Sequence, residues 1–244
     1  MCGKQQYVSD ELTHFVGRKK DPEEQFCLLC KILREGRLLP HGKEDHAAGN
    51  LRLPFDEQGR LRPFWTEGQV NELFFTQMVS FCDIPLECLS AHVGKYSSFG
   101  IAFAKDFLAR KGASPVFYVA EQAPCTDHGR QGAGRVRPRG EFFDEVVRCW
   151  VSENITRLRG LSPTTRAERL FLWYFLAYTK FFDHRLKETD AADYYMEREW
   201  RTIGEVTFGL ANVCRVIVPN TEYRERLRNS FPGFPGTITP LSEL

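Results

Sequence analysis

Two glutamates separated by one residue, Glu197 and Glu199, lie in residues 193–201 (DYYMEREWR), the segment of this chain whose residue types most suggest catalysis. In an extended strand, side chains alternate between the two faces, so Glu197, Glu199 and Arg201 would share one face. Like charges this close repel, and a carboxylate neighbour tends to raise the pKa of a carboxyl group. Folding needs no such pair, whereas catalytic sites use one for acid, base or charge-stabilising work. The alternative is a solvated strand face in which Arg198 and Arg201 pair with the two acids.

A histidine and a Tyr-Ser pair on earlier segments are further candidates. His14 falls in residues 9–16, a short stretch that predicts the first strand. Tyr96 and Ser97 stand at the entrance of the apolar stretch 99–104, where they could line a ligand cleft. A hydrogen-bonded core histidine and a turn anchored by the tyrosine are the alternative interpretations.

Apolar periodicity and end signals predict the elements that must position these side chains. A helix should begin after Asp21, with Pro22 at its first position, and end at Gly36. The mixed element order predicts an α+β fold with a mixed/antiparallel sheet core and flanking helices, in a single domain over residues 1–244. We predict strands at 78–83, 99–104, 115–120, 195–203 and 214–218, helices at 85–93, 106–112, 141–159, 165–182 and 220–228, and loops at 41–63 and 124–140.

Composition and missing motifs narrow the function classes. The 33 Lys and Arg against 32 Asp and Glu give no global argument for a nucleic-acid or membrane partner. The eight cysteines are scattered and no apolar signal stretch follows the first residues, so we expect a cytoplasmic protein with reduced thiols. Cys27 and Cys30 lack a second ligand pair, which favours core packing over a metal site. No P-loop, dinucleotide-binding or nucleophile-elbow motif occurs, which argues against those three enzyme classes.

Six segments spread over nearly the whole chain resemble a bacterial family of abortive phage resistance proteins of AbiGi type. The resemblance implies a role in abortive infection or a toxin–antitoxin pair, with a cognate defence protein or a nucleic acid as partner. The segments are 13–17 (THFVG), 32–36 (ILREG), 81–85 (FCDIP), 95–103 (KYSSFGIAF), 115–119 (PVFYV) and 195–201 (YMEREWR).

The order of a histidine, a Tyr-Ser pair and a late glutamate is similar to that of the ADP-ribosyltransferase fold, whose toxin branches include DarT-type enzymes that modify DNA. This more distant resemblance implies that His14 holds the nicotinamide ribose end of NAD and that Tyr96 or Ser97 shapes the nicotinamide pocket. It implies that Glu199, or else Glu197, bonds the ribose 2′-OH and stabilises the positive charge that develops on the sugar. The other carboxylate would act as a base on the incoming nucleophile. The chain departs from the family pattern because it lacks a Ser-Thr-Ser run in the middle motif.

Three functions stay open from the sequence. The first is an NAD-dependent ADP-ribosyltransferase or NAD-cleaving effector, with NAD as substrate. The second is a non-catalytic antitoxin or sensor that binds a protein or nucleic acid, aided by the basic stretch 130–139. The third is a metal-dependent nuclease, for which Asp193 would have to join the two glutamates. The first function requires His14, Tyr96 and Glu199 to meet in one cleft, and a Glu199 facing solvent far from His14 would remove it.

Overall fold

A computed structural model describes residues 9–40, 78–120, 122–127, 135–139, 141, 145, 177–187, 190 and 193–244. The predicted loop 41–63 and most of the two predicted helices 141–159 and 165–182 lie outside the described residues. The described chain divides into two compact units, one from residues 9–40, 78–115 and 196–244, the other from the remaining residues between 116 and 195. The single domain over residues 1–244 stays a prediction.

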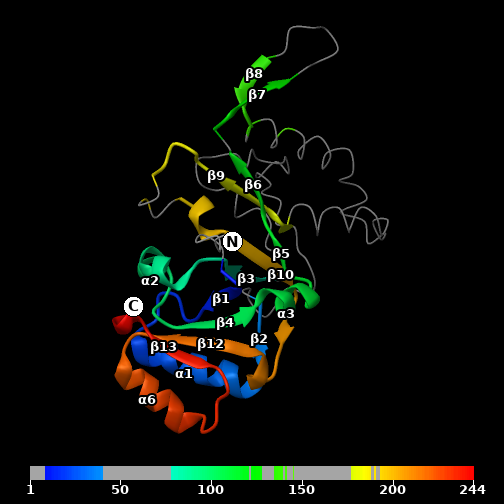
Figure 1. Cartoon of the computed structure of the whole chain (residues 1–244). Coiled ribbons are helices and arrows are strands. Elements are labelled where there is room, and N and C mark those ends of the chain that lie inside the picture. The colour runs from blue at the N-terminus through cyan, green and yellow to red at the C-terminus, as the bar shows by residue number, and fades with distance from the viewer. Residues whose placement is uncertain are drawn as a thin grey trace, which may run out of the picture. The chain divides into compact units, whose positions relative to one another are not determined.

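A seven-stranded sheet forms the centre of the first unit (Figure 1). The strands of this unit are β1 (Glu11–Phe15), β2 (Arg37–Leu38), β3 (Met78–Cys82), β4 (Gly100–Ala104), β5 (Ser114–Pro115), β10 (Glu199–Ile203), β11 (Val206–Thr207), β12 (Val213–Val218) and β13 (Thr237–Pro240). The sheet order is β13-β12-β4-β1-β3-β10-β5, and only β12 and β13 among these described strands run parallel. Strands β2 and β11 form a separate antiparallel pair. The predicted α+β class with a mixed, mostly antiparallel sheet is therefore confirmed.

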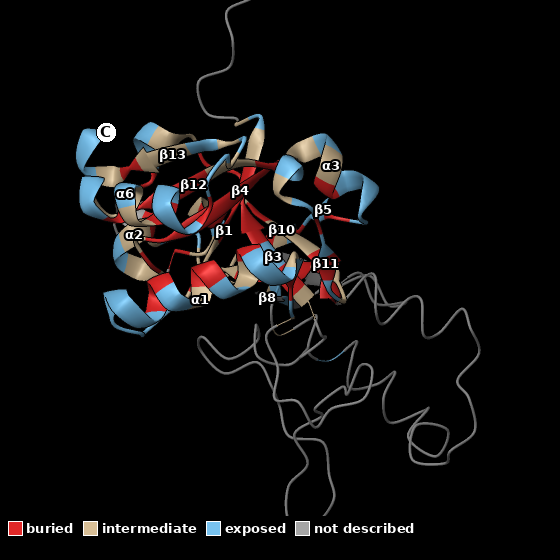
Figure 2. Cartoon of the chain, turned by 90° about the horizontal axis from the view of Figure 1, so that it is seen from below, coloured by how far each residue is buried: buried red, intermediate tan, exposed pale blue. Residues whose placement is uncertain are grey.

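The helices of this unit are α1 (Pro22–Glu35), α2 (Ser90–Lys95), α3 (Lys105–Arg110) and α6 (Thr221–Ser230), with 3-10 turns at Leu86–Cys88, Leu210–Asn212 and Leu241–Glu243. The predicted helix 85–93 is thus a 3-10 turn followed by α2. Figure 2 shows buried strands in the middle of the unit, and helices that keep one side exposed. Within the described part of the chain, every helix is too short or too polar to cross a bilayer.

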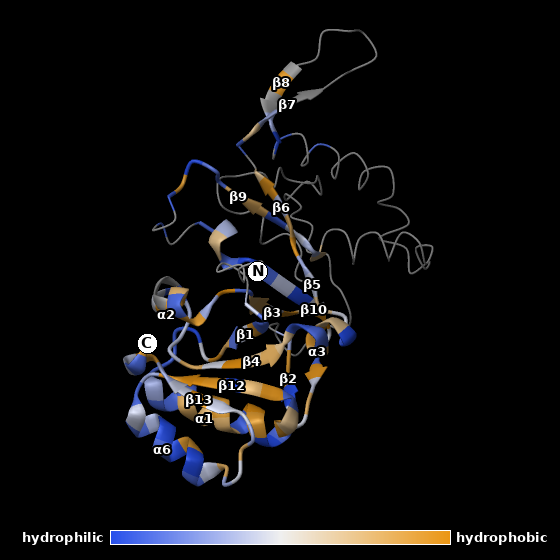
Figure 3. Ribbon diagram, in the orientation of Figure 1, coloured by the Kyte–Doolittle hydropathy of each residue, from blue (hydrophilic) through white to orange (hydrophobic). Residues whose placement is uncertain are grey.

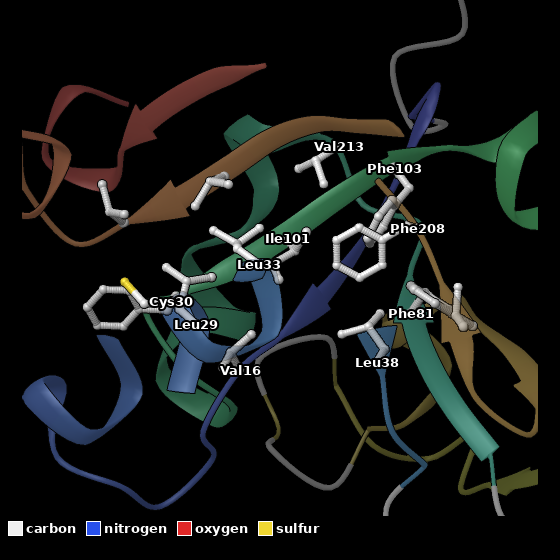
Figure 4. Packing of buried hydrophobic residues seen from close by; sticks show 14 of the residues in the cluster. Val16, Leu29, Cys30, Leu33, Leu38, Phe81, Ile101, Phe103, Phe208 and Val213 are labelled. Atoms are coloured by element: carbon white, nitrogen blue, oxygen red, sulfur yellow. The ribbon is translucent and has the colours of Figure 1, made fainter. Parts of the chain in front are cut away.

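The main core lies between one face of the sheet and the helices α1 and α6. Leu29 from α1 and Leu227 from α6 pack with Ile101 and Phe103 from β4, all at most 1% exposed. In Figure 4 the rings of Phe103 and Phe208 lie against each other, with their centroids 4.9 Å apart. Figure 3 shows the reason for this arrangement: β12 is mostly hydrophobic, whereas the outer side of α6 is hydrophilic.

The opposite face of the sheet carries a smaller apolar cluster under α2. Cys82 from β3 and Ile217 from β12 pack there with Ile84 and Leu89, and Phe15 packs against them. The sheet therefore has two distinct faces, an α1 face and an α2 face, and each candidate residue can be assigned to one of them.

Helix α1 begins and ends where the sequence predicts. The Asp21 carboxylate accepts hydrogen bonds from the N–H groups of Glu23 and Glu24, each at 2.9 Å, and Pro22 occupies the first helical position. Gly36 ends the helix with φ +62, a left-handed conformation that glycine adopts without a steric penalty. Asn220 caps the last helix, α6, because its side chain accepts a hydrogen bond from Tyr223 N at 3.2 Å.

The prediction for residues 195–203 needs a correction. Tyr195–Glu197 is a 3-10 turn, and strand β10 begins only at Glu199. Arg198 between them has φ +44, which an extended strand does not tolerate. Glu197 therefore lies in the turn and not on a strand face. Glu199 and Arg201 do share a face of β10, as predicted.

The second unit contains two small ladders. Strands β6 (Phe117–Ala120) and β9 (Thr179–Phe182) are parallel, and β7 (Pro124–Asp127) and β8 (Arg135–Pro138) are antiparallel. The predicted strand 115–120 is therefore divided between β5 and β6. The end of the predicted helix 165–182 is strand β9, since threonine and aromatic residues favour a paired strand. The ends of the predicted loop 124–140 form a ladder, because alternation in β8 outweighs the turn-forming residues.

Candidate functional site

Three of the five predicted site residues gather at the end of α2 and the start of β10. The Tyr96 hydroxyl donates to Oε1 of Glu197, and Lys95 Nζ lies 2.7 Å from the same oxygen. The Glu197 side chain is only 3% exposed. A buried carboxylate without a partner would cost several kcal/mol, so both neighbours are needed to hold it there.

Glu199 has its own set of partners beside Glu197. Ser80 Oγ donates to its Oε1 at 2.6 Å, while Nε and a terminal nitrogen of Arg201 donate to its two oxygens at 2.8 and 3.1 Å. The Glu199 side chain is 7% exposed, so it does not face bulk solvent. We call Lys95, Tyr96, Glu197, Glu199 and Arg201 the carboxylate cluster.

The left-handed residue Arg198 brings both carboxylates into this cluster. Its carbonyl accepts a hydrogen bond from Asp83 N at 3.2 Å, which ties the turn to the end of β3. Such a backbone conformation in a non-glycine residue costs about 1–3 kcal/mol and tends to persist where function or packing demands it. Burial, and then the charges of Glu197 and Glu199, raise the pKa of the Tyr96 hydroxyl, which therefore stays protonated and donates.

Aromatic and cationic side chains enclose the ring of Tyr96. Phe15 stacks on it at 5.9 Å between centroids and His92 at 6.5 Å, while the Arg18 guanidinium lies 5.1 Å from its centroid. These contacts hold the ring of Tyr96 in place, with its hydroxyl directed at Glu197.

His14 lies on the other face of the sheet from Glu199, so the expected meeting of His14 with Tyr96 and Glu199 on one face does not occur. Strand pairing places Thr13 opposite Cys82 and Cys82 opposite Glu199, so these three side chains share the α2 face. His14 follows Thr13 and therefore points to the α1 face, where it lines a cavity of about 230 Å³. Ser80 connects the two faces. Its carbonyl oxygen lies 2.9 Å from His14 Nδ1, and its hydroxyl donates to Glu199.

Ser97 contacts helix α1. Its hydroxyl donates to Gln25 Oε1 at 3.0 Å, and the Gln25 amide donates to the carbonyls of Gly17 and Lys20 at 3.2 and 2.8 Å. Ser97 is 4% exposed and also accepts a hydrogen bond from Phe99 N. In this position it holds the loop between β1 and α1 and does not join the carboxylate cluster.

Among the described residues, no group of three or more His, Cys, Asp or Glu side chains is placed to hold a metal ion. Asp193, the acid that the nuclease hypothesis requires, accepts a hydrogen bond from Tyr195 N at 3.0 Å. Cys27 is exposed and Cys30 is buried on α1. The basic stretch 130–139 lies only partly within the described residues.

His92 should make folding stability sensitive to pH. Burial lowers its pKa from the usual 6.5, against the raising effect of Glu197, while Lys95 lowers it further and a Met196 backbone contact raises it. The folded pKa is below the unfolded one, so the unfolded chain takes up the proton first as the pH falls, and stability is lost below about pH 6.5. We expect a lower urea midpoint at about pH 5.5 than at about pH 7.5.

Replacement of His92 by Gln removes the titrating group and is the matched comparison. The urea midpoint of this variant should fall less over the same pH range. Equal losses in the two proteins would show that another group causes the pH dependence.

Sequence reasoning missed Ser80, Lys95, His92 and Arg18 as members or neighbours of the cluster. Lys95 directly precedes Tyr96, so its position beside the predicted tyrosine was the one available signal. Ser80 and Arg18 carry no such signal, because only the pairing of β3 with β10 and the path of the β1–α1 loop bring them close.

Comparison with known proteins gives one family match and two similar structures. The model of the family described as "Putative abortive phage resistance protein AbiGi, antitoxin" matches residues 74–230. The structures are of Thermus sp. 2.9 DarT, one in complex with carba-NAD+ (13% identity, 95% of each chain covered, TM-score 0.36), the other with NAD+ (13% identity, 94% of this chain and 95% of that chain, TM-score 0.35). With TM-scores this low, the likeness to DarT supports no statement about the site. No curated protein matches the sequence.

Proposed function

The chain belongs to the AbiGi family of abortive phage resistance proteins, whose match covers more than half of its length, and from this premise we propose a role in anti-phage defence. We further propose that it acts there as an NAD-dependent ADP-ribosyltransferase or NAD-cleaving effector. The carboxylate cluster would carry the chemistry.

The hydrogen bond from Tyr96 to Glu197 is the observation that carries this proposal. The two residues are 101 positions apart in the sequence, and each was singled out by its own motif. Glu199 lies close enough to raise the pKa of Tyr96. The tyrosine and both glutamates of the predicted order therefore meet in one place.

The cluster has the charges that glycosidic cleavage of NAD requires. When the bond between ribose C1′ and nicotinamide breaks, nicotinamide leaves with the bonding electrons and positive charge develops on the ribose. An ionised carboxylate beside the ribose stabilises that charge. Lys95 Nζ lies 2.7 Å from an oxygen of Glu197 and Arg201 Nε lies 2.8 Å from an oxygen of Glu199, so a cation stands beside each carboxylate.

His14 can take part only if the ligand enters between β1 and β3. Within the described residues these strands pair at Thr13 and Cys82 alone, whereas β1 and β4 pair over five positions. The ring nitrogen of His14 already reaches the Ser80 carbonyl across this junction. A ligand seated where the two strands part would have His14 on one side and Glu199 on the other.

Nicotinamide release from NAD by the full chain tests the proposal, with Glu199→Gln as the variant. We expect the variant to lose about 10²–10³-fold in rate, the usual cost of removing one charge-stabilising group. Glu225→Gln on the exposed side of α6 is the matched control and should release nicotinamide at the wild-type rate. Absence of release from the wild type, or equal rates for Glu199→Gln and wild type, would contradict the proposal.

A non-catalytic antitoxin is the second candidate, and two observations favour it. The family description contains the word antitoxin. Both glutamates are also buried and paired with a cation, as in ion pairs that only shape a fold. This candidate predicts that Glu199→Gln, folded as judged by circular dichroism, still protects cells against phage as well as the wild type does.

A further inference from the structure

The cavity that His14 lines has a cationic rim. Four of its lining side chains are positively charged, and one lining side chain, Glu35, is negative. The cavity lies between β1, the β1–α1 loop, α1 and β2. Its cations are Arg18, Lys20, Lys31 and Arg37.

Among the described residues, three of these cations form weak, exposed ion pairs. Lys20 lies 3.7 Å from Glu24, while Lys31 and Arg37 lie 3.9 and 3.1 Å from Glu35. Their side chains are 47%, 67% and 47% exposed, and pairs of this kind contribute little to stability. The charged ends can therefore turn toward an anion in the cavity at low cost.

The loop that carries Arg18 and Lys20 is fixed before any ligand arrives. Gly17 has φ +77, and Lys20 N donates to the Gly17 carbonyl at 3.0 Å. Gln25 bonds the carbonyls at both ends of this turn, and Ser97 in turn bonds Gln25. A fixed loop lowers the entropy that binding would otherwise cost.

The interior of the cavity is apolar, with one buried imidazole. Val16 and Leu38 are each 1% exposed, and Leu28 and Ile32 complete the wall. A carbonyl oxygen only accepts, so Nδ1 of His14 donates to the carbonyl of Ser80. An apolar wall with cations at its rim suits a ligand that combines a planar ring with phosphate groups.

We propose that this cavity binds the diphosphate group of a nucleotide, with Lys20, Lys31 and Arg37 meeting its phosphate oxygens. The inference deepens the proposed function and rests on it for the identification of NAD as the ligand. The shared chemistry is the nucleoside diphosphate, which NAD and ADP both supply.

Calorimetric titration of the full chain with NAD, ADP and adenosine tests the inference. The test variant is Lys31→Met/Arg37→Met, and the matched control is Arg110→Met/Arg228→Met, which removes two exposed cations of the same unit that do not line the cavity. We expect NAD and ADP to bind at least roughly tenfold more weakly to the test variant, because each lost phosphate contact is charge-assisted. The control should bind both like the wild type, and adenosine should bind equally to all three proteins.

Two results would overturn the inference: failure of both NAD and ADP to bind the wild type, or equal affinities in the wild type and the test variant. Its failure is distinguishable from failure of the proposed function. If nicotinamide is released but the test variant keeps the wild-type KM for NAD, the proposed diphosphate site is contradicted and the proposed NAD-cleaving activity is supported. If ADP binding requires Lys31 and Arg37 but nicotinamide is never released, the proposed diphosphate site is supported and the proposed NAD-cleaving activity is contradicted.

Discussion

Replacement of Lys95 by Met should lower the free energy of unfolding by about 3–5 kcal/mol, because it leaves the Glu197 carboxylate buried without its cation. The two side chains are 12% and 3% exposed, so solvent screens their interaction little. The Tyr96 hydroxyl would remain as a donor, but a hydrogen bond does not replace a full charge. Urea unfolding followed by circular dichroism measures the change.

A second substitution separates the charge effect from lost packing. The Lys95→Met/Glu197→Gln double variant removes both charges of this pair, so most of the lost stability should return. Arg110→Met serves as the control, since Arg110 and Asp106 are 68% and 76% exposed and their pair should contribute less than about 1 kcal/mol. A loss below about 1 kcal/mol for Lys95→Met would show that water reaches Glu197.

Replacement of Gly36 by Ala should lower the free energy of unfolding by about 2–4 kcal/mol, from two separate causes. The backbone has φ +62, a conformation that costs an alanine about 1 kcal/mol. A Cβ atom there would also lie 2.5 Å from the backbone oxygen of Phe208. That residue cannot move away easily, because its N–H donates to the Gly36 carbonyl at 2.7 Å.

Gly112→Ala isolates the steric part of this effect. Gly112 has φ +91, and a Cβ atom there would meet no atom within 4 Å. Its cost should be limited to the backbone strain, about 1 kcal/mol. Equal losses for Gly36→Ala and Gly112→Ala in urea unfolding would contradict the clash with Phe208.

Local signals in the sequence were sufficient for much of the fold. The ends of α1 at Asp21 and Gly36 follow from side-chain capping and from a left-handed glycine, and both depend on residues within one helical turn. Strands β3 and β4 follow from short apolar stretches bounded by turn-forming residues. The prediction of a helix was wrong at Thr179–Phe182, which form strand β9. This strand pairs with β6, and a local sequence pattern does not reveal which strands pair.

The sequence by itself determined which side chains could do chemistry: the two glutamates of residues 197–199, Tyr96 with Ser97, and His14. Only the tertiary structure decided which of them meet. Register places Glu199 on the α2 face and His14 on the α1 face, since a shift of one residue along a strand reverses the face of a side chain. Partners distant in the sequence likewise decided that Tyr96 reaches Glu197 while Ser97 turns to Gln25 on α1. Such choices depend on which strands and helices pack together, and no spacing within a single segment encodes them.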